Sequence, residues 1–255
     1  MMKKWITFDL DGTLMQNPFV GYVFPEIEQR IMKLNSRLHN VTQHLVEEHK
    51  NRMDNGQYAG AYDWDDIVSV YLQANNVRDF INVKDILVKH CKAPNVYLLE
   101  QPIVEVLGKL KQKGYALAVV TNGFTRYQLP VMDVLDLTHH FDVIVTPEEA
   151  RCAKPDERIY KSLLDEGEIV AHVGDRIDHD VISANILGVR SIWIHRNLPE
   201  MISRLPINER SGCFELLEIA LEKLRKETQT EFDQLPAEAI PKEVICNIEE
   251  LLTIL

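Results

Sequence analysis

Residues 5–14 have the sequence WITFDLDGTL, which joins a short apolar run to two aspartates one residue apart. The first four residues are apolar or β-branched without alternation, as is typical of a strand buried on both faces of a parallel sheet. Gly12 and Thr13 favour a tight turn directly after the acids. The segment therefore predicts a buried strand that ends at Asp9 and Asp11.

Four later stretches share this apolar, β-branched character, and segments with a helical pattern accompany them. The strand-like stretches are 116–120, 141–145, 169–173 and 191–194, and the helical segments are 101–114, 125–136, 156–166 and 178–187. Pro102 stands in the first turn of the first helical segment and Gly114 closes it, as expected for helix ends. This alternation predicts an α/β fold built on a doubly wound parallel sheet.

About a hundred residues separate the first two predicted strands, far more than a simple crossover needs. The segments 63–72 and 80–91 have the pattern of helices. A further set of apolar residues alternates spacings of four and three, which predicts one face of a single long helix: Ile27, Ile31, Leu34, Leu38, Val41 and Leu45. We therefore expect residues 17–97 to form a helical cap that leaves and re-enters the core beside the acids and gates the site. A helical decoration without a role in the site is the alternative.

The composition limits the partners of this chain. Of its 255 residues, 45% are hydrophobic and 26% are charged, as is usual for a globular protein. Acidic residues outnumber basic ones by 39 to 28, and the formal net charge is −11. This excess argues against a nucleic acid polymer or an anionic membrane as partner, because both need Lys and Arg. No apolar run reaches the roughly 20 residues that span a bilayer, and the N-terminal run does not resemble a secretory signal.

The cysteines and histidines show no metal-binding spacing. The four cysteines have no CxxC pair: Cys91, Cys152, Cys213 and Cys246. We expect reduced thiols in a cytoplasmic protein, with disulfides or zinc as the alternative. His39, His44 and His49 recur every five residues, so on a helix they spiral apart and cannot share a zinc ion.

Polar side chains follow the predicted strands at the point where each strand ends. Asp9 and Asp11 follow the first strand, and Asp175, Asp178 and Asp180 follow the fourth. The ends of the second and third strands carry Thr121, Asn122, Gly123 and Thr146. The carboxyl ends of parallel strands meet at one edge of a sheet, where ligands bind. Acids gathered there repel one another unless a hard cation neutralises them, so the sequence predicts a Mg²⁺ site. For any single acid, the alternative is a turn or a helix cap.

Four short motifs in this order resemble those of the haloacid dehalogenase-like (HAD) hydrolase superfamily. Residues 9–13, DLDGT, are similar to the first motif, DxDGT. Thr121 after an apolar strand is similar to the second motif, and Lys154 before Pro-Asp to the third. Residues 174–180, GDRIDHD, are similar to the fourth, GDxxxxD. The resemblance covers about 1–16 and 98–196.

The same resemblance implies how the chain is divided. The implied domains are a Rossmann-like core, residues 1–16 and 98–255, and a helical cap of the C1 type, residues 17–97. Relatives with this cap end in a short strand and a helix, which residues 244–252 resemble. Residues 198–241 are therefore expected to be an insertion within the core, with a charged helix near 209–227. Its role is either a surface elaboration or a partner or dimer surface, and the sequence selects no oligomeric state.

The resemblance implies phosphoryl-transfer chemistry at the first motif. Asp9 is implied as a nucleophile that attacks phosphorus and forms an aspartyl-phosphate. Asp11 is implied as the general acid and base, which requires a raised pKa when substrate is bound. Mg²⁺ is implied as the cofactor, held by the carboxylates of Asp9 and Asp175 and the main-chain carbonyl of Asp11. Such an ion cancels the repulsion between a carboxylate and a phosphate.

The remaining motifs are implied to bind the phosphoryl group and to order the site. Thr121 and the main-chain N–H groups of Asn122 and Gly123 are expected to donate to phosphoryl oxygens, although a strand-end cap is the alternative for Thr121. Lys154 is expected beside the nucleophile as a point charge. Asp180 is expected to orient the metal ligands or Lys154 from outside the metal's coordination shell.

Together these features predict a Mg²⁺-dependent phosphatase that hydrolyses a small phosphorylated metabolite, such as a nucleotide or a sugar phosphate. Asp11 argues against dehalogenation, because halide leaves unprotonated and the dehalogenases of the family lack this carboxylate. A phosphomutase that uses the same aspartyl-phosphate is one alternative. A binding or regulatory protein with the HAD fold and weak turnover is the other.

Three further features have less direct interpretations. Relatives often have Gly three residues before the motif lysine, where this chain has Arg151, and a positive φ there would strain an arginine. We expect Arg151 to be a surface side chain and Asp178 to cap the helix that follows it. The aromatic residues of the predicted cap fill its small core or stack on a base or sugar ring: Phe19, Tyr22, Phe24, Tyr58, Tyr62 and Trp64.

Overall fold

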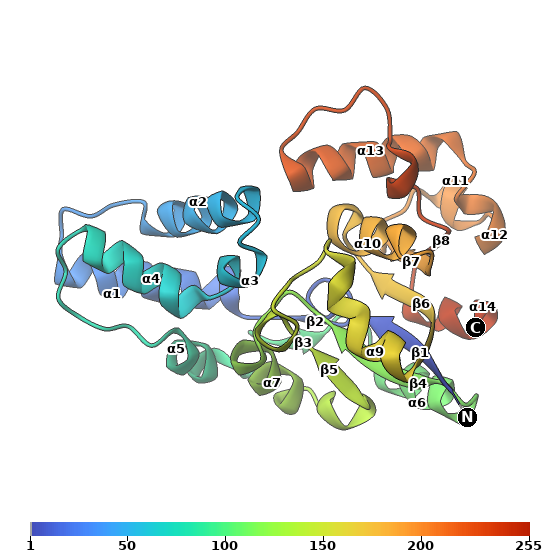
Figure 1. Ribbon diagram of the computed structural model, residues 1–255, viewed down its shortest axis with the longest axis horizontal. Coiled ribbons are helices and arrows are strands. Elements are labelled where there is room, and N and C mark those ends of the chain that lie inside the picture. Colours follow the sequence, from blue (N-terminus) through green and yellow to red (C-terminus); the bar gives the residue numbers. More distant parts are fainter. Residues whose placement is uncertain (1) are drawn as a thin grey trace.

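The computed structural model describes residues 2–255 and shows an α/β core with a helical lobe at one end (Figure 1). The core is built on six parallel strands in the order β5-β4-β1-β6-β7-β8. Helices cover both faces of this sheet, so the doubly wound parallel sheet predicted from the sequence is confirmed. Because β1 pairs with both β4 and β6, the first acidic motif lies at the centre of the carboxyl edge.

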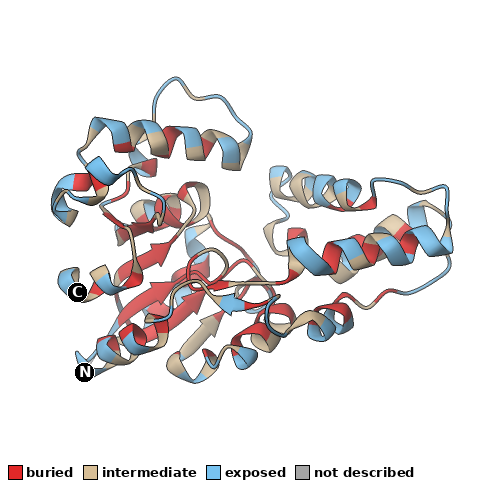
Figure 2. Cartoon of the chain, turned by 180° about the vertical axis from the view of Figure 1, so that it is seen from behind, coloured by how far each residue is buried: buried red, intermediate tan, exposed pale blue. Residues whose placement is uncertain are grey.

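The strands match the predicted runs within a few residues at each end. They are β1 (Lys3–Phe8), β4 (Ala116–Val120), β5 (Val143–Val145), β6 (Gly167–Gly174), β7 (Arg190–Ile194) and β8 (Glu243–Ile245). Most of their length is buried (Figure 2). Within β1, Trp5 packs into the apolar cluster on one face, whereas Ile6 and Phe8 pack into the cluster on the other. Burial on both faces explains why the sequence of this strand does not alternate.

Helices connect the strands and cover the sheet. In the core they are α6 (Ile103–Gln112), α7 (Thr125–Val134), α8 (Pro147–Ala150), α9 (Lys161–Glu166), α10 (Ile182–Ile186) and α14 (Leu251–Ile254). Gly114 ends the turn after α6 with a φ of 92°, a conformation that glycine adopts without strain. Arg151 ends α8 with a φ of 57° and is exposed, so the predicted surface arginine also occupies a strained backbone position.

Five helices form the lobe between β1 and β4. They are α1 (Phe24–Leu34), α2 (Val41–Asp54), α3 (Tyr58–Ala61), α4 (Trp64–Ala74) and α5 (Val83–His90). The chain enters the lobe through β2 (Met15–Gln16) and leaves it through β3 (Tyr97–Leu98), and these two strands pair antiparallel. The pairing holds the two connections side by side at the carboxyl edge of the sheet.

The prediction of a single long helix over positions 27–45 is wrong. The structure has two helices there, α1 and α2, because residues 35–40 leave the helical path. Asn35 is extended, and its side-chain oxygen accepts the N–H of Arg37 at 3.1 Å. Asn40 adopts a φ of 54°. Asparagine side chains can hydrogen-bond to the nearby backbone and so offer it an alternative to helical hydrogen bonds. The apolar spacing continues across the break, so it did not reveal the interruption.

Residues between β7 and β8 form a separate group of helices. They are α11 (Glu200–Ser203), α12 (Ile207–Arg210) and α13 (Phe214–Thr228). The helix predicted near 209–227 is therefore α13, and it starts later because the chain turns between Arg210 and Cys213.

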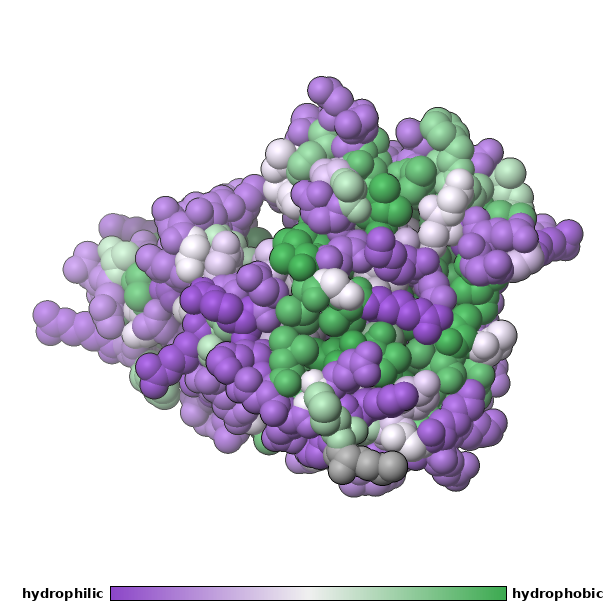
Figure 3. All heavy atoms as spheres, turned by 45° about the vertical axis from the view of Figure 1, so that its right-hand side comes forward, coloured by the Kyte–Doolittle hydropathy of each residue, from purple (hydrophilic) through white to green (hydrophobic). Residues whose placement is uncertain are grey.

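In Figure 3, the helical lobe presents a mostly hydrophilic surface. Among the described residues, no helix combines the length and the apolar character that crossing a membrane requires.

Candidate active site

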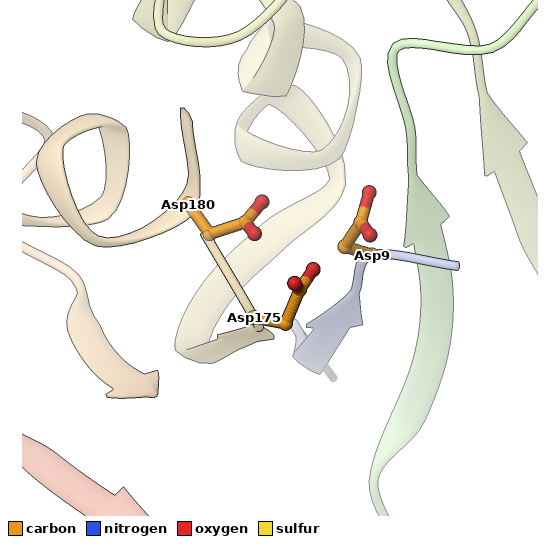
Figure 4. A group of neighbouring side chains, drawn as sticks. All are labelled: Asp9, Asp175 and Asp180. Atoms are coloured by element: carbon orange, nitrogen blue, oxygen red, sulfur yellow. The ribbon is translucent and has the colours of Figure 1, made fainter. Parts of the chain in front are cut away.

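The carboxyl ends of β1 and β6 bring three aspartates together. Asp9 directly follows β1, Asp175 directly follows β6, and Asp180 lies in the π-helical turn Ile177–Val181 ahead of α10. Figure 4 shows the three side chains next to one another at the ends of these strands. One oxygen from each lies within 4.8 Å of the others, which is a spacing that a single ion can bridge. The hard oxygen donors of such a group suit Mg²⁺.

Lys154 is buried among these carboxylates. Its Nζ donates to Asp9 Oδ1 at 2.7 Å and to Asp180 Oδ1 at 2.6 Å. Burial lowers the pKa of Lys154, but the charges of Asp180 and Asp9 outweigh burial and hold the pKa above its usual range. Lys154 is therefore a fixed positive charge beside the carboxylate of the first motif.

Lys154 contacts two of the three carboxylates, and the Nζ of Lys223 lies 3.8 Å from the third, Asp175. Burial raises the pKa of Asp9 to about 8, against the opposing effect of Lys154. Burial also raises the pKa of Asp175 to about 6, and the charge of Asp180 adds to this effect. Burial thus disfavours the ionised forms of Asp9 and Asp175, and a divalent cation that binds the clustered carboxylate oxygens would favour these forms. The residues present therefore fit a Mg²⁺ ion.

Asp11 lines the same cavity as Asp9 and Lys154. Its Oδ2 accepts a hydrogen bond of 2.6 Å from Nε2 of Gln128, a residue of α7. Burial raises its pKa, while the hydrogen bond from Gln128 opposes the rise. Gln128 lies so close to Gly123 that a Cβ at that position would come within 2.0 Å of Nε2. A glycine is therefore required for this contact.

The end of β4 presents Thr121 and Asn122, and the two side chains have different partners. Thr121 Oγ1 accepts hydrogen bonds from Gly123 N–H at 3.2 Å and from Gln128 Nε2 at 3.3 Å. The Asn122 amide accepts from Lys154 N–H at 2.7 Å and donates to the Lys154 carbonyl at 2.9 Å. Asn122 thus fixes the backbone of Lys154.

Asp180 is held from three sides. It accepts from Lys154, from the N–H of Arg176 at 3.0 Å, and its Oδ1 lies 3.1 Å from Nε2 of His172. His172 in turn contacts the hydroxyl of Thr7 in β1 at 2.9 Å. This buried network fixes the carboxylate that orients Lys154.

The site residues form one cavity of about 280 Å³. Its lining includes the predicted residues Asp9, Asp11, Thr121, Asn122, Gly123, Lys154 and Asp180. Two of the aromatic residues considered as a stacking surface, Tyr62 and Trp64, also line it. Sequence reasoning assigned no such place to four further lining residues: His49, Gln128, Arg176 and His179. Asp175 lies beside the cavity, its carboxylate within 2.8 Å of a Cβ built on Gly12. His49 was considered only as a zinc ligand, but its ring stacks on Trp64 in the wall of the cavity.

The side chain of Asp178 does not cap the helix that follows, so this expectation is wrong. It instead accepts two hydrogen bonds from Arg176, at 2.9 Å from Nε and 2.7 Å from Nη2. The short distance along the chain favours this pair, and Arg176 lines the cavity.

The comparison with protein families identifies the group to which this site belongs. A family model described as haloacid dehalogenase-like hydrolase matches residues 3–188. The chain belongs to this family. The matched residues carry all four motifs, and they also contain the helical lobe and the buried Lys154.

Curated relatives cover part of the chain. The chain is 34% identical over 96 residues to a phosphoserine phosphatase of Thermus thermophilus, over 36% of this chain and 39% of the relative. It is 30% identical over 138 residues to the bovine haloacid dehalogenase-like hydrolase domain-containing protein 3, over 51% of this chain and 55% of the relative. A glyceraldehyde 3-phosphate phosphatase of Methanothermobacter thermautotrophicus is 34% identical over 36% of this chain and 42% of the relative. The chain thus spans about two fifths to just over half of these relatives.

Solved structures share the fold over nearly the whole chain. A HAD phosphatase from Thermococcus onnurineus has a TM-score of 0.66 at 19% identity, covering 98% of this chain and 97% of that one. The L-2-haloacid dehalogenase from Xanthobacter autotrophicus has a TM-score of 0.59 at 18% identity, covering 99% and 98%. Phosphatases and dehalogenases therefore share this architecture, and the residues of the site must separate the two activities.

Proposed function

We propose that this protein is a Mg²⁺-dependent phosphatase that hydrolyses a small phosphate monoester through a phosphorylated Asp9. The observation that carries the proposal is the group formed by Asp9, Asp175 and Lys154, with Asp11 in the same cavity as Asp9 and Lys154. A dehalogenase needs no acid for its leaving group. The presence of Asp11 in this cavity therefore favours phosphoryl transfer.

Each step uses a residue whose place in the cavity is described above. A carboxylate oxygen of Asp9 attacks phosphorus, and the bond to the leaving oxygen breaks as Asp11 gives that oxygen a proton. Lys154, Thr121 and the N–H groups of Asn122 and Gly123 hold the phosphoryl oxygens. Asp11 then takes a proton from water, which attacks phosphorus and releases Asp9 and inorganic phosphate. Carboxylate oxygens of Asp9 and Asp175 and the carbonyl of Asp11 would hold Mg²⁺, which when bound neutralises the charge of the phosphate.

The cavity favours a small substrate with an uncharged leaving group. Its volume of about 280 Å³ suits a metabolite rather than a polymer. The wall contributed by the helical lobe, which we propose acts as a cap, includes Tyr62 and Trp64. The nearest cation on that side, Arg176, already pairs with Asp178. A leaving group that carries a carboxylate would therefore find its nearest positive charge already paired. We propose that this protein prefers uncharged leaving groups, unlike phosphoserine phosphatases.

Hydrolysis of p-nitrophenyl phosphate by the purified chain tests the proposal. We expect turnover with Mg²⁺ that EDTA abolishes, and a loss of at least about 10⁴-fold in Asp9→Asn, since the covalent step is lost. Asp165→Asn is the matched control, because Asp165 is exposed and, among residues 2–255, forms an ion pair only with Lys161. Undiminished turnover in Asp9→Asn would refute the nucleophile. Rearrangement of a sugar bisphosphate faster than its hydrolysis would instead support a phosphomutase, and a stable wild type without turnover would support a binding protein.

A further inference from the structure

The helix α13 from the segment between β7 and β8 packs on the loop that carries Asp175. Its apolar residues Leu216, Ala220 and Leu224 share a buried cluster with Ile177 and Trp193 of the core. The indole N–H of Trp193 donates to the carbonyl of Asp175 at 2.8 Å. The segment predicted as a surface elaboration or a partner surface therefore supports the fourth motif directly.

The last two turns of α13 place a charged pair against this loop. Glu227 is almost fully buried, and its Oε2 accepts the N–H groups of Ile177 at 2.9 Å and Asp178 at 3.1 Å. Lys223, one helical turn earlier, lies between two carboxylates. Its Nζ is 3.0 Å from Glu227 Oε1 and 3.8 Å from Asp175 Oδ2.

We propose that Glu227 holds the Lys223 ammonium away from Asp175 and so keeps that carboxylate available to a divalent cation. The inference rests on the proposed function, which makes Asp175 a metal ligand. Both residues of α13 are positioning residues, because neither reaches the phosphate-binding side of the cavity.

The expected effects of the two side chains are opposite in sign. An ammonium beside Asp175 competes with a dication for the same oxygen and repels it. Glu227 offers the ammonium a nearer partner at the correct spacing of four residues on one helix. Loss of Glu227 therefore moves Lys223 toward Asp175 and weakens metal binding, whereas loss of Lys223 strengthens it.

Calorimetric titration of the full chain with Mg²⁺ in the absence of substrate measures this directly. We expect Glu227→Gln to raise the Kd about tenfold, as is usual for residues that act on metal ligands from outside the coordination shell. The amide oxygen of Gln still accepts the two backbone N–H groups, so the loop keeps these hydrogen bonds. Lys223→Gln is expected to lower the Kd severalfold. In the Lys223→Gln background, Glu227→Gln is expected to change the Kd less than about twofold, because its effect passes through Lys223.

A second pair on the same helix provides the control. Glu222 and Lys226 have the same spacing, lie 3.8 Å apart and are exposed, so Glu222→Gln and Lys226→Gln are expected to leave the Kd unchanged. The inference would be overturned if Glu227→Gln weakened Mg²⁺ binding equally in the presence and in the absence of Lys223. It would also be overturned if Lys223→Gln bound Mg²⁺ more weakly than the wild type. If the enzyme is active but Glu227→Gln and Lys223→Gln leave the Kd for Mg²⁺ unchanged, the inference about α13 is overturned while the proposed function stands. A wild type that binds no Mg²⁺ would remove the metal from the proposed function as well.

Discussion

At the scale of single residues, Asp11 has two carboxyl oxygens in different surroundings. Oδ2 accepts the hydrogen bond from Gln128, whereas Oδ1 is buried and has no hydrogen-bond partner among residues 2–255. Burial raises the pKa of Asp11. A carboxyl group that gains a proton readily and has one oxygen without a partner suits a group that must carry and deliver that proton.

Asp11→Asn is therefore expected to separate the two chemical steps. With p-nitrophenyl phosphate, whose leaving group needs no proton, we expect a burst of one equivalent of nitrophenolate followed by slow turnover. With an alkyl phosphate we expect no burst and a loss of about 10²–10⁴-fold, since the alkoxide must be protonated. Rapid-quench measurements with both substrates check this, with wild type as the reference. Equal losses in the first step for both substrates would contradict the assignment of Asp11 as the acid.

The sequence predicted the acids of the site better than it predicted their neighbours. Asp9, Asp11 and Asp175 stand directly after apolar runs, and strand ends of a parallel sheet meet at one edge. Gln128 stands in α7 and Tyr62 in the turn directly after α3, and the local sequence at neither position indicates what the side chain faces. Tyr62 reaches the site only because the lobe places its hydroxyl 3.0 Å from Asn122 Nδ2. Contacts of this kind depend on how the lobe packs against the core.

At the scale of elements, the end of β6 depends on a glycine. A Cβ at Gly174 would come within 2.1 Å of the carboxyl carbon of Asp180. Gly174→Ala is therefore expected to displace Asp180 and loosen Lys154, with a loss of about 1–3 kcal/mol in unfolding free energy and a marked loss of turnover. Gly108 in α6 has open space around its position, so Gly108→Ala is expected to stabilise the protein by about 0.5–1 kcal/mol. Urea unfolding of both variants, and their turnover, check these values. Full activity in Gly174→Ala would show that Asp180 can be moved without consequence.

The elements also show which patterns carry structural information and which do not. Runs such as Ala116–Val120 were predicted to the residue because burial on both faces leaves only apolar side chains. The apolar spacing across the positions 27–45 predicted one helix, yet Asn35 and Asn40 end and restart the helical path. Leu38 still packs against the core of the lobe from within the break. Periodicity identified the buried face but not the interruption.

At the scale of the whole molecule, the residues between β7 and β8 contact more than the core. Gln229, directly after α13, accepts a hydrogen bond from Lys50 of α2. The segment between β7 and β8 therefore contacts the helical lobe. The sequence could define this segment as an insertion, because it separates β7 from β8. Its position could not be predicted, since it depends on apolar residues of α13 that meet Trp193 from a distant strand.

The charge of the site connects metal binding to the stability of the whole protein. The pKa values of Asp9 and Asp175 are raised to about 8 and about 6. At pH 6 Asp9 is mostly protonated and Asp175 about half protonated, whereas at pH 8 Asp175 is ionised and Asp9 about half ionised, so a cation displaces fewer protons at pH 8. The affinity for Mg²⁺ is therefore expected to rise with pH over this range. At pH 8 and a concentration of 100 times the Kd, binding stabilises the folded state by about 2.7 kcal/mol. For a chain of this size that raises the Tm by about 5–10 °C.

Thermal unfolding with and without Mg²⁺ at both pH values measures this shift, and the same Mg²⁺ concentration is used throughout. The increase in Tm is expected to be smaller at pH 6, because protons on Asp9 and Asp175 compete with the ion. Asp175→Asn is expected to lose most of the increase at pH 8, while Asp165→Asn, an exposed aspartate outside the site, retains it. If Mg²⁺ raises the Tm more at pH 6 than at pH 8, the ion binds elsewhere. Protons on Asp9 and Asp175 would compete with it at pH 6, whereas ligands that are already deprotonated at pH 6 would not show this competition.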